Sequence, residues 1–306
     1  MTYSALAQSV LAVPPLALTP DFEINRAANA AQIRHLETGG VNTLLYGGNA
    51  NVHNWPVSKF DEWLSVLEES AAADSWLIPS VGPDWGKLLD TAAVIKHHKF
   101  PVAMALPLIA PQNAEGVVRG IEEFVSRSGV PLIIYIKTDN YVPVEDIARL
   151  HEQGVVFGIK YAVPRQDSMN DPYLTAMIAA IGGDRIVSGF GEPPAFKHVL
   201  DFKLAGFTAG CVCIAPTLST RYRKALQAGD RVLAEKLLQP FLKLEALREK
   251  SSAIRVLHDA VTFSGIADMG PILPLLSRTD SSEHAAIRIA ARELYEAEMA
   301  ARKVSA

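Results

Sequence analysis

A short apolar run, Val155–Ile159, ends in Lys160, a residue that could attack a carbonyl carbon. If this run is a buried strand, the lysine amine lies at the rim of an apolar environment. Desolvation lowers the pKa of a lysine and leaves its amine free to act as a nucleophile. Lys160 is therefore the candidate for imine formation, although a strand-end lysine can also be an ion-paired or snorkelling side chain.

The preceding apolar run, Leu132–Ile134, ends in Tyr135. Adjacent strands of a sheet lie roughly 4.8 Å apart, so the two run ends place Tyr135 beside Lys160 at the same level. A phenol next to an amine can carry protons to and from a bound substrate. The alternative for Tyr135 is a packing role with a solvated hydroxyl.

A third run, Leu44–Tyr46, leads into a turn rich in glycine, Gly47-Gly48-Asn49-Ala50-Asn51. Successive glycines let backbone N–H groups approach an anion closely, and Asn49 adds side-chain donors. The carboxylate of a 2-oxo acid needs such a cradle. Gly-Gly-Asn is also ordinary turn chemistry, which is the alternative.

The rest of the chain predicts a fold that brings the ends of these three runs together. Short apolar runs alternate with amphipathic segments for eight cycles, which predicts a (β/α)8 barrel with its active site at the carboxyl ends of the strands. A doubly wound open sheet is disfavoured because prolines, not a glycine-rich phosphate turn, follow the first run. The predicted strands are Val10–Leu18, Val41–Gly48, Trp76–Val81, Val102–Leu108, Pro131–Ile136, Val155–Lys160, Arg185–Phe190 and Phe207–Ile214.

Beyond Gly229 the strand signal stops and helical periodicity continues. We therefore expect a barrel over residues 1–228 and a helical extension, packed on the barrel, over residues 229–306. Cys211 and Cys213 are predicted on one face of the last strand, as small buried residues without a disulfide bond between them.

The charge, the apolar runs and the histidine positions argue against nucleic acids, membranes and metals as partners. A net charge of −4 and the absence of a dense Lys/Arg run argue against nucleic-acid binding. No apolar run approaches the roughly 20 residues needed to span a bilayer, so we expect no membrane association and a cytoplasmic protein. No two of the eight histidines stand at predicted strand ends with ligand spacing, so neither a metal nor another cofactor is expected.

Taken together, these run ends resemble the dihydrodipicolinate synthase and N-acetylneuraminate lyase superfamily over nearly the whole chain. Gly47–Asn51 stands where that family has a Gly-Thr-Thr-Gly-Glu type motif, and Gly158-Ile159-Lys160 matches its strand-six lysine motif. Ser188-Gly189 matches the family's Ser-Gly on strand seven. By resemblance, Lys160 is the Schiff-base lysine and Tyr135 the general acid/base.

The same resemblance implies that Gly47, Gly48 and Asn49 hold the substrate carboxylate and that Gly189 lines the substrate site. It also implies a (β/α)8 barrel with a C-terminal helical extension and a homodimer or homotetramer. The expected activity is that of a lyase, an aldolase or dehydratase with no cofactor, which acts through a lysine imine on pyruvate or another small 2-oxo acid, for example a 2-keto-3-deoxy sugar acid.

In two loops the sequence departs from the pattern of the synthases, and these departures favour the sugar-acid dehydratases of the superfamily. The loop after strand four reads Pro107–Pro111, without the tyrosine pair of true synthases, and the segment Lys137–Tyr141 lacks their arginine. The short loop is similar to that of dehydratases that act on 2-keto-3-deoxy sugar acids. Two alternatives stay open, namely 4-hydroxy-tetrahydrodipicolinate synthase of lysine biosynthesis and a non-catalytic oxo-acid-binding relative.

Overall fold

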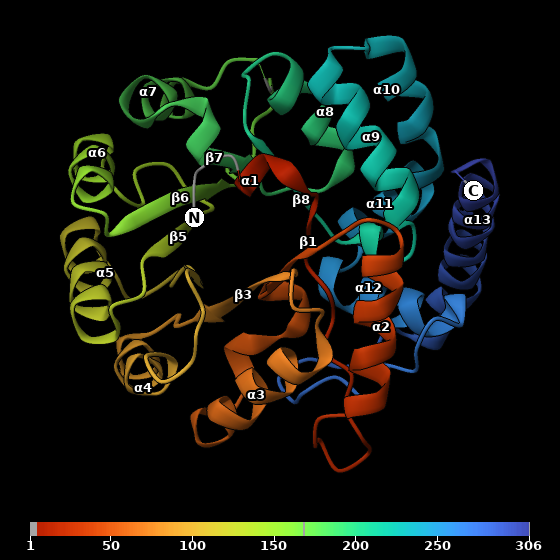
Figure 1. Ribbon diagram of the computed structural model, residues 1–306, viewed down its shortest axis with the longest axis horizontal. Coiled ribbons are helices and arrows are strands. Elements are labelled where there is room, and N and C mark those ends of the chain that lie inside the picture. The colour runs from red at the N-terminus through yellow and green to blue at the C-terminus, as the bar shows by residue number, and fades with distance from the viewer. Residues whose placement is uncertain (1–4, 168, 306) are drawn as a thin grey trace.

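A computed structural model describes residues 5–167 and 169–305, and they form a closed barrel of eight parallel strands paired in chain order (Figure 1). This confirms the predicted (β/α)8 architecture. Both faces of the strands are covered, which is why they read as continuous apolar runs. The strands are β1 Leu11–Ala12, β2 Thr43–Tyr46, β3 Trp76–Val81, β4 Ala103–Ala105, β5 Leu132–Ile136, β6 Val156–Tyr161, β7 Ile186–Ser188 and β8 Gly206–Ala209.

Helices return the chain from each strand to the next and surround the barrel (Figure 1). Their ends follow local capping chemistry. The Asn113 side chain, for example, accepts a hydrogen bond from the backbone N–H of Gly116 at the start of α5. Gly129, with φ 71°, ends this helix. The helices are α2 Arg26–Thr38, α3 Phe60–Ser70, α4 Trp85–Ile95, α5 Ala114–Ser128, α6 Val144–Glu152, α7 Pro172–Ile181, α8 Glu192–Leu200 and α9 Pro216–Ala228.

A short helix, α1 Ala5–Gln8, covers the amino-terminal end of the barrel, the end that faces the viewer in Figure 1. Its Leu6 is fully buried. A Cβ atom on Gly158 would lie 3.2 Å from the Leu6 side chain, and one on Gly206 would lie 3.0 Å from the Leu6 carbonyl oxygen. Two strand glycines therefore make room for this plug.

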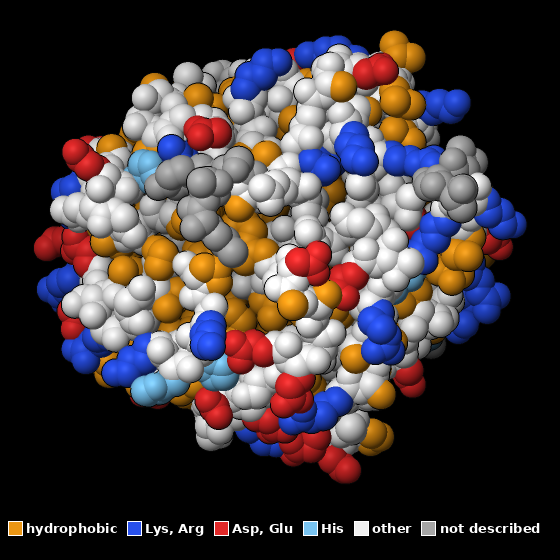
Figure 2. Space-filling view, viewed as in Figure 1, with side chains coloured by type: hydrophobic (Ala, Val, Ile, Leu, Met, Phe, Trp, Pro, Cys, Tyr) orange, Lys and Arg blue, Asp and Glu red, His pale blue; other side chains and the backbone are white. Residues whose placement is uncertain are grey.

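The molecular face at this end carries basic side chains interspersed with acidic ones (Figure 2). No continuous basic surface is visible on it. Among the described residues, no helix combines the length and the apolar composition needed to cross a membrane.

Four further α-helices follow α9 in the described part of the chain, and α12 lies at the opposite, carboxyl-terminal end of the barrel. α12 contacts the 3-10 turn η1 Gly48–Ala50, and α13 packs against α9 and α12. The division into a barrel of residues 1–228 and an extension of residues 229–306 stays a prediction. These helices are α10 Arg231–Leu238, α11 Leu242–Lys250, α12 Ala253–Ser264 and α13 Ser281–Ser305.

Five of the predicted strands, the first, second, fourth, seventh and eighth, are at least twice as long as the observed ones, and the first and the eighth have clear local causes. β1 ends at Ala12 because Pro14 and Pro15 have no N–H group to donate to a neighbouring strand. The eighth run leaves the sheet at Gly210, whose backbone is helical, and continues as a 3-10 helix, η5 Cys211–Cys213. The prediction that both cysteines lie on one strand face is therefore wrong, but both are buried and free.

Candidate active site

Lys160 on β6 and Tyr135 on β5 are direct partners in the strand register. The Lys160 side chain is only 4% exposed, and its Nζ atom lies 4.1 Å from the centroid of the Tyr135 ring. The structure thus places the two predicted residues side by side near the carboxyl ends of their strands. This is the end of a (β/α)8 barrel at which active sites are built.

Burial changes the protonation of both groups. Desolvation, reinforced by the positive charges of Lys137 and Arg248, lowers the pKa of Lys160 to about 7. Desolvation raises the pKa of Tyr135 to about 12. At neutral pH the site therefore combines a partly neutral amine, which is a nucleophile, with a protonated phenol, which is a proton donor.

Gly189, the residue after β7, leaves space for the lysine stem. A Cβ atom on Gly189 would lie 3.1 Å from Lys160 Cγ and 2.9 Å from the carbonyl oxygen of Tyr161. Any larger residue here would push against the backbone of β6. Gly189 thus borders the lysine stem, and its role in lining a substrate site stays a prediction.

The glycine turn after β2 lies at the same end of the barrel. A Cβ atom on Gly47 would lie 2.8 Å from both Met104 Cε and Ser80 Oγ, whereas one on Gly48 would meet no heavy atom within 4 Å. The amides of Gly48 and Asn49 open the 3-10 turn η1, so they have no partner within that turn. The arrangement leaves open space and two backbone donors at Gly48.

The Asn49 side chain is engaged within the protein. Its Nδ2 donates to the carbonyl oxygen of Val13 at 2.8 Å, which fastens the turn to the segment after β1. The side-chain amide nitrogen predicted to bind a carboxylate is thus committed to the backbone. Only its second N–H and its backbone amide remain for a ligand.

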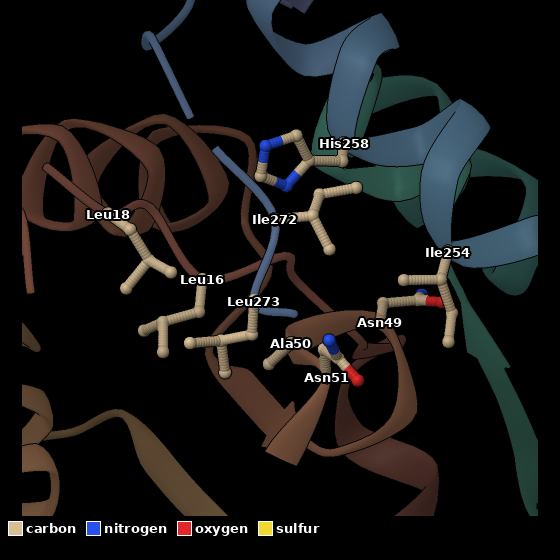
Figure 3. A pocket seen from close by; sticks show the side chains of 9 residues that line it. All are labelled: Leu16, Leu18, Asn49, Ala50, Asn51, Ile254, His258, Ile272 and Leu273. Carbon is tan, nitrogen blue, oxygen red and sulfur yellow. The ribbon is translucent and has the colours of Figure 1, made fainter. Parts of the chain in front are cut away.

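A small cavity with both apolar and polar side chains in its lining lies between this turn and α12 (Figure 3). Asn51 adopts the left-handed conformation with φ 54°, and its buried Nδ2 has no hydrogen-bond partner among the described residues. The turn contacts α12 around this cavity. The cavity is lined by Leu16, Leu18, Asn49, Ala50, Asn51, Ile254, His258, Ile272 and Leu273.

Two residues of the site were not singled out from the sequence. Ser80 on β3 is fully buried beside Gly47, and its Oγ has no partner among the described residues. Its position, as a polar residue near the end of the apolar run Trp76–Val81, could have indicated it from the sequence. Arg248 comes from α11 and acts electrostatically on both Lys160 and Tyr135. No local pattern indicates that a residue of α11 reaches the barrel mouth.

Donor atoms of Glu192, Cys211 and Glu245 lie within 4.8 Å of one another. Metal ligands must be deprotonated, but burial raises the pKa of Glu192 to about 8 and raises that of the Cys211 thiol well above its usual value. Glu245 already pairs with the guanidinium of Arg248 at 2.5 Å. The cluster therefore suits an arginine counter-ion better than a metal.

Other polar residues near the mouth have structural partners. Arg165 donates hydrogen bonds to Asp139, Asp171 and the Tyr161 hydroxyl, which ties the loop after β6 to the loop after β5. Lys137 is exposed, with its Nζ 5.9 Å from the centroid of the Tyr135 ring.

No family model matches the chain. It is 26% identical over 294 residues to a probable 5-dehydro-4-deoxyglucarate dehydratase of Cereibacter sphaeroides, which covers 92% of this chain and 93% of the relative. A Streptomyces coelicolor protein of the same name is 21% identical over 268 residues, with 85% and 84% coverage.

Solved structures agree on the fold. Dihydrodipicolinate synthase from Agrobacterium tumefaciens superimposes with a TM-score of 0.83 at 16% identity, covering 96% of this chain and 100% of that one. Sialic acid aldolase from Ruminococcus gnavus gives 0.81 at 12% identity, covering 96% and 99%. The sequence relatives and the structural neighbours together support a member of the dihydrodipicolinate synthase and N-acetylneuraminate lyase superfamily. The predicted resemblance is confirmed, including its lean toward sugar-acid dehydratases.

Proposed function

We propose that this protein is a Schiff-base lyase that removes water from a 2-oxo-3-deoxy sugar acid through Lys160. The observation that carries the proposal is the buried lysine with a pKa of about 7, in register with a protonated tyrosine. The names of the sequence relatives support dehydration over the other reactions open to an imine.

Imine formation uses the two residues in sequence. The neutral amine of Lys160 attacks the C2 carbonyl, and the resulting carbinolamine loses water to give an iminium. Tyr135, protonated at neutral pH, donates the proton that the departing hydroxyl needs. Its phenolate is then stabilised by the positive charge of the iminium beside it.

Elimination follows from the electron demand of the iminium. The C3 proton leaves to a base, for which the Tyr135 phenolate is the nearest group that we identify. The C3 electron pair then forms the C3–C4 double bond as the C4 hydroxyl leaves as water, with the proton that Tyr135 has just received from C3. Hydrolysis of the imine returns Lys160 and the product, so the reaction needs no oxidant and no cofactor.

The substrate carboxylate is assigned to the turn after β2. The open space at Gly48 and the backbone amides of Gly48 and Asn49 support this assignment. Gly47 brings the turn against Ser80, whose hydroxyl has no partner among the described residues and can bond to the carboxylate. Gly189 leaves room for the substrate beside the lysine.

The synthase of lysine biosynthesis fits less well. Such synthases have a tyrosine pair after strand four and a free arginine after strand five. This sequence has neither. Arg165 does not replace that arginine because it is held by Asp139 and Asp171. A non-catalytic oxo-acid-binding relative would form the imine without turnover.

Proton NMR in D2O with a panel of 2-oxo-3-deoxy sugar acids tests the proposal. We expect loss of the C4 hydroxyl with formation of a C3–C4 unsaturated or further-tautomerised product. Release of pyruvate and an aldehyde would show an aldolase instead. Imine formation without any product would show the non-catalytic relative, and either result would contradict the proposal.

A homodimer or homotetramer and a cytoplasmic location complete the proposal, by analogy with the superfamily. Sedimentation velocity at micromolar concentration gives the oligomeric state directly. A monomeric mass would contradict it.

A further inference from the structure

The cavity between the turn after β2 and α12 has two buried polar side chains in its lining, one from each side. Asn51 comes from the turn and is 5% exposed, and His258 comes from α12 and is 3% exposed. The Asn51 amide nitrogen and one ring nitrogen of His258 are directed into the cavity (Figure 3). Hydrogen-bonding groups of two separate elements therefore face one small space.

The Asn51 side chain is only partly bonded. Its Oδ1 accepts a hydrogen bond from Asn54 Nδ2 at 3.0 Å, whereas its buried Nδ2 has no partner among the described residues. A buried donor that bonds to nothing is costly. The turn side of the cavity therefore needs an acceptor.

The His258 ring presents the complementary group. Its Nε2 lies 2.9 Å from the carbonyl oxygen of Gly270, which can only accept, so Nε2 carries the proton and donates. Desolvation lowers the pKa of His258, which keeps the ring neutral at neutral pH. The other nitrogen of a neutral imidazole is an acceptor. On the α12 side, Nδ1 therefore needs a donor.

The size and the lining of the cavity select the ligand. The centre of a water-sized sphere can occupy about 10 Å³ of it, which is room for one water and not for a larger molecule. Water can accept from an amide and donate to an imidazole nitrogen at once. A chloride ion would meet the lone pair of His258 Nδ1, and the described lining residues hold no charged side chain to stabilise it.

We infer that this cavity binds one ordered water, which accepts a hydrogen bond from Asn51 Nδ2 and donates one to His258 Nδ1. The water braces the turn after β2 against α12, while Asn49 fastens the same turn to Val13. Asn51 and His258 are thus positioning residues for the backbone amides of Gly48 and Asn49. Their effect on substrate binding rests on the proposed function.

A high-resolution crystal structure of the intact protein tests the water itself. We expect one water within about 3.2 Å of both Asn51 Nδ2 and His258 Nδ1. Crystals soaked in bromide separate a halide from water, because bromide scatters anomalously. A structure with no water between these two atoms, or with bromide there, would overturn the inference.

Borohydride trapping of pyruvate tests the bracing of the turn. His258→Phe removes the acceptor, and Asn51→Gly removes the donor while tolerating the φ of 54°. Each variant is expected to raise the half-saturation concentration of pyruvate about fivefold, as for the loss of one buried hydrogen-bonded bridge. The trapping rate at saturating pyruvate should not change, because Lys160 is untouched.

His284→Phe is the matched control. The Nε2 atom of His284 also lies against a backbone carbonyl oxygen, that of Thr279 at 3.1 Å, but His284 does not line the cavity. This variant should keep the wild-type half-saturation concentration. An unchanged value in both cavity variants, or an equal rise in the control, would contradict the bracing role.

The two proposals fail in different ways. If wild type does not trap pyruvate, the proposed function and the effect on substrate binding are both overturned, whereas the crystal structure still decides whether the water binds. Normal trapping by a protein whose crystal structure lacks the water contradicts only the inference drawn from the cavity.

Discussion

The two ends of the barrel are built from opposite chemistry. At the amino-terminal end, α1 inserts the fully buried Leu6 against glycines of β6 and β8. At the carboxyl-terminal end, a lysine and an arginine are buried and a tyrosine is half-buried beside the lysine, and burial lowers the pKa of the lysine. One end is packed for stability, and the other keeps a charged group where it is energetically unfavourable.

The same strands therefore stabilise the barrel at one end and position the site residues at the other. Apolar packing at the first end stabilises the closed barrel that holds Lys160 and Tyr135 in register. In the proposed function, the cost of desolvating a cation at the second end makes the lysine reactive. Substitutions at the two ends should therefore separate activity from stability.

Tyr135→Phe is expected to have the largest effect, a loss of about 10³-fold in kcat, because the proton carrier is removed while the ring stays packed. Thermal unfolding should be nearly unchanged. Steady-state kinetics on the dehydration substrate measures the loss. A decrease below about threefold would remove Tyr135 from the proton transfers.

Leu6→Ala tests the opposite end. Removing a fully buried leucine is expected to lower the free energy of unfolding by about 3 kcal/mol, through lost burial and the cavity left behind. Below the unfolding transition, kcat/KM should match wild type. Urea unfolding gives the first quantity. A large fall in kcat/KM of the folded variant would mean that the plug also controls the active site.

Lys160→Met should stabilise the protein at neutral pH by on the order of 2 kcal/mol, because a buried cation is replaced by an apolar side chain of similar length. The pKa of Lys160 is about 7 in the folded state and near 10.5 in the unfolded state. Wild type therefore gains stability as pH rises from about 7 toward 10. The advantage of the variant should shrink over that range, and a constant advantage would contradict a depressed pKa.

The pH dependence of imine formation gives the smallest effect. Only the neutral amine reacts, so with a pKa of about 7 the trapping rate should rise about tenfold from pH 6 to pH 8 and then level off. Lys137→Met should move the midpoint to higher pH, because a positive charge that disfavours protonation is removed. A rate that still rises steeply above pH 9 would indicate an ordinary lysine.

The placement of Tyr135 beside Lys160 could be predicted from the sequence because it depends on local pattern and strand order. Tyr135 and Lys160 end consecutive apolar runs, and consecutive strands of a barrel are neighbours. Arg248 could not be predicted, because its place depends on how α11 packs over Gly210, 38 residues earlier in the chain. The commitment of Asn49 to Val13 is likewise a tertiary contact without a local signature.

The strand bounds were less predictable than the strand order. Proline chemistry shortened β1, and the helical backbone at Gly210 moved Cys211 and Cys213 from the sheet into a 3-10 helix. Apolar composition alone does not distinguish a buried strand from a buried turn, because both exclude water equally well.

The most direct test of the central claim is reduction of the imine. Wild type and Lys160→Met are incubated with pyruvate and sodium borohydride, and intact mass and peptide mapping locate the adduct. We predict one pyruvate-derived adduct, on Lys160, in wild type and none in the variant. An adduct on another lysine, or no adduct with pyruvate and longer 2-oxo acids, would contradict the Schiff-base role of Lys160.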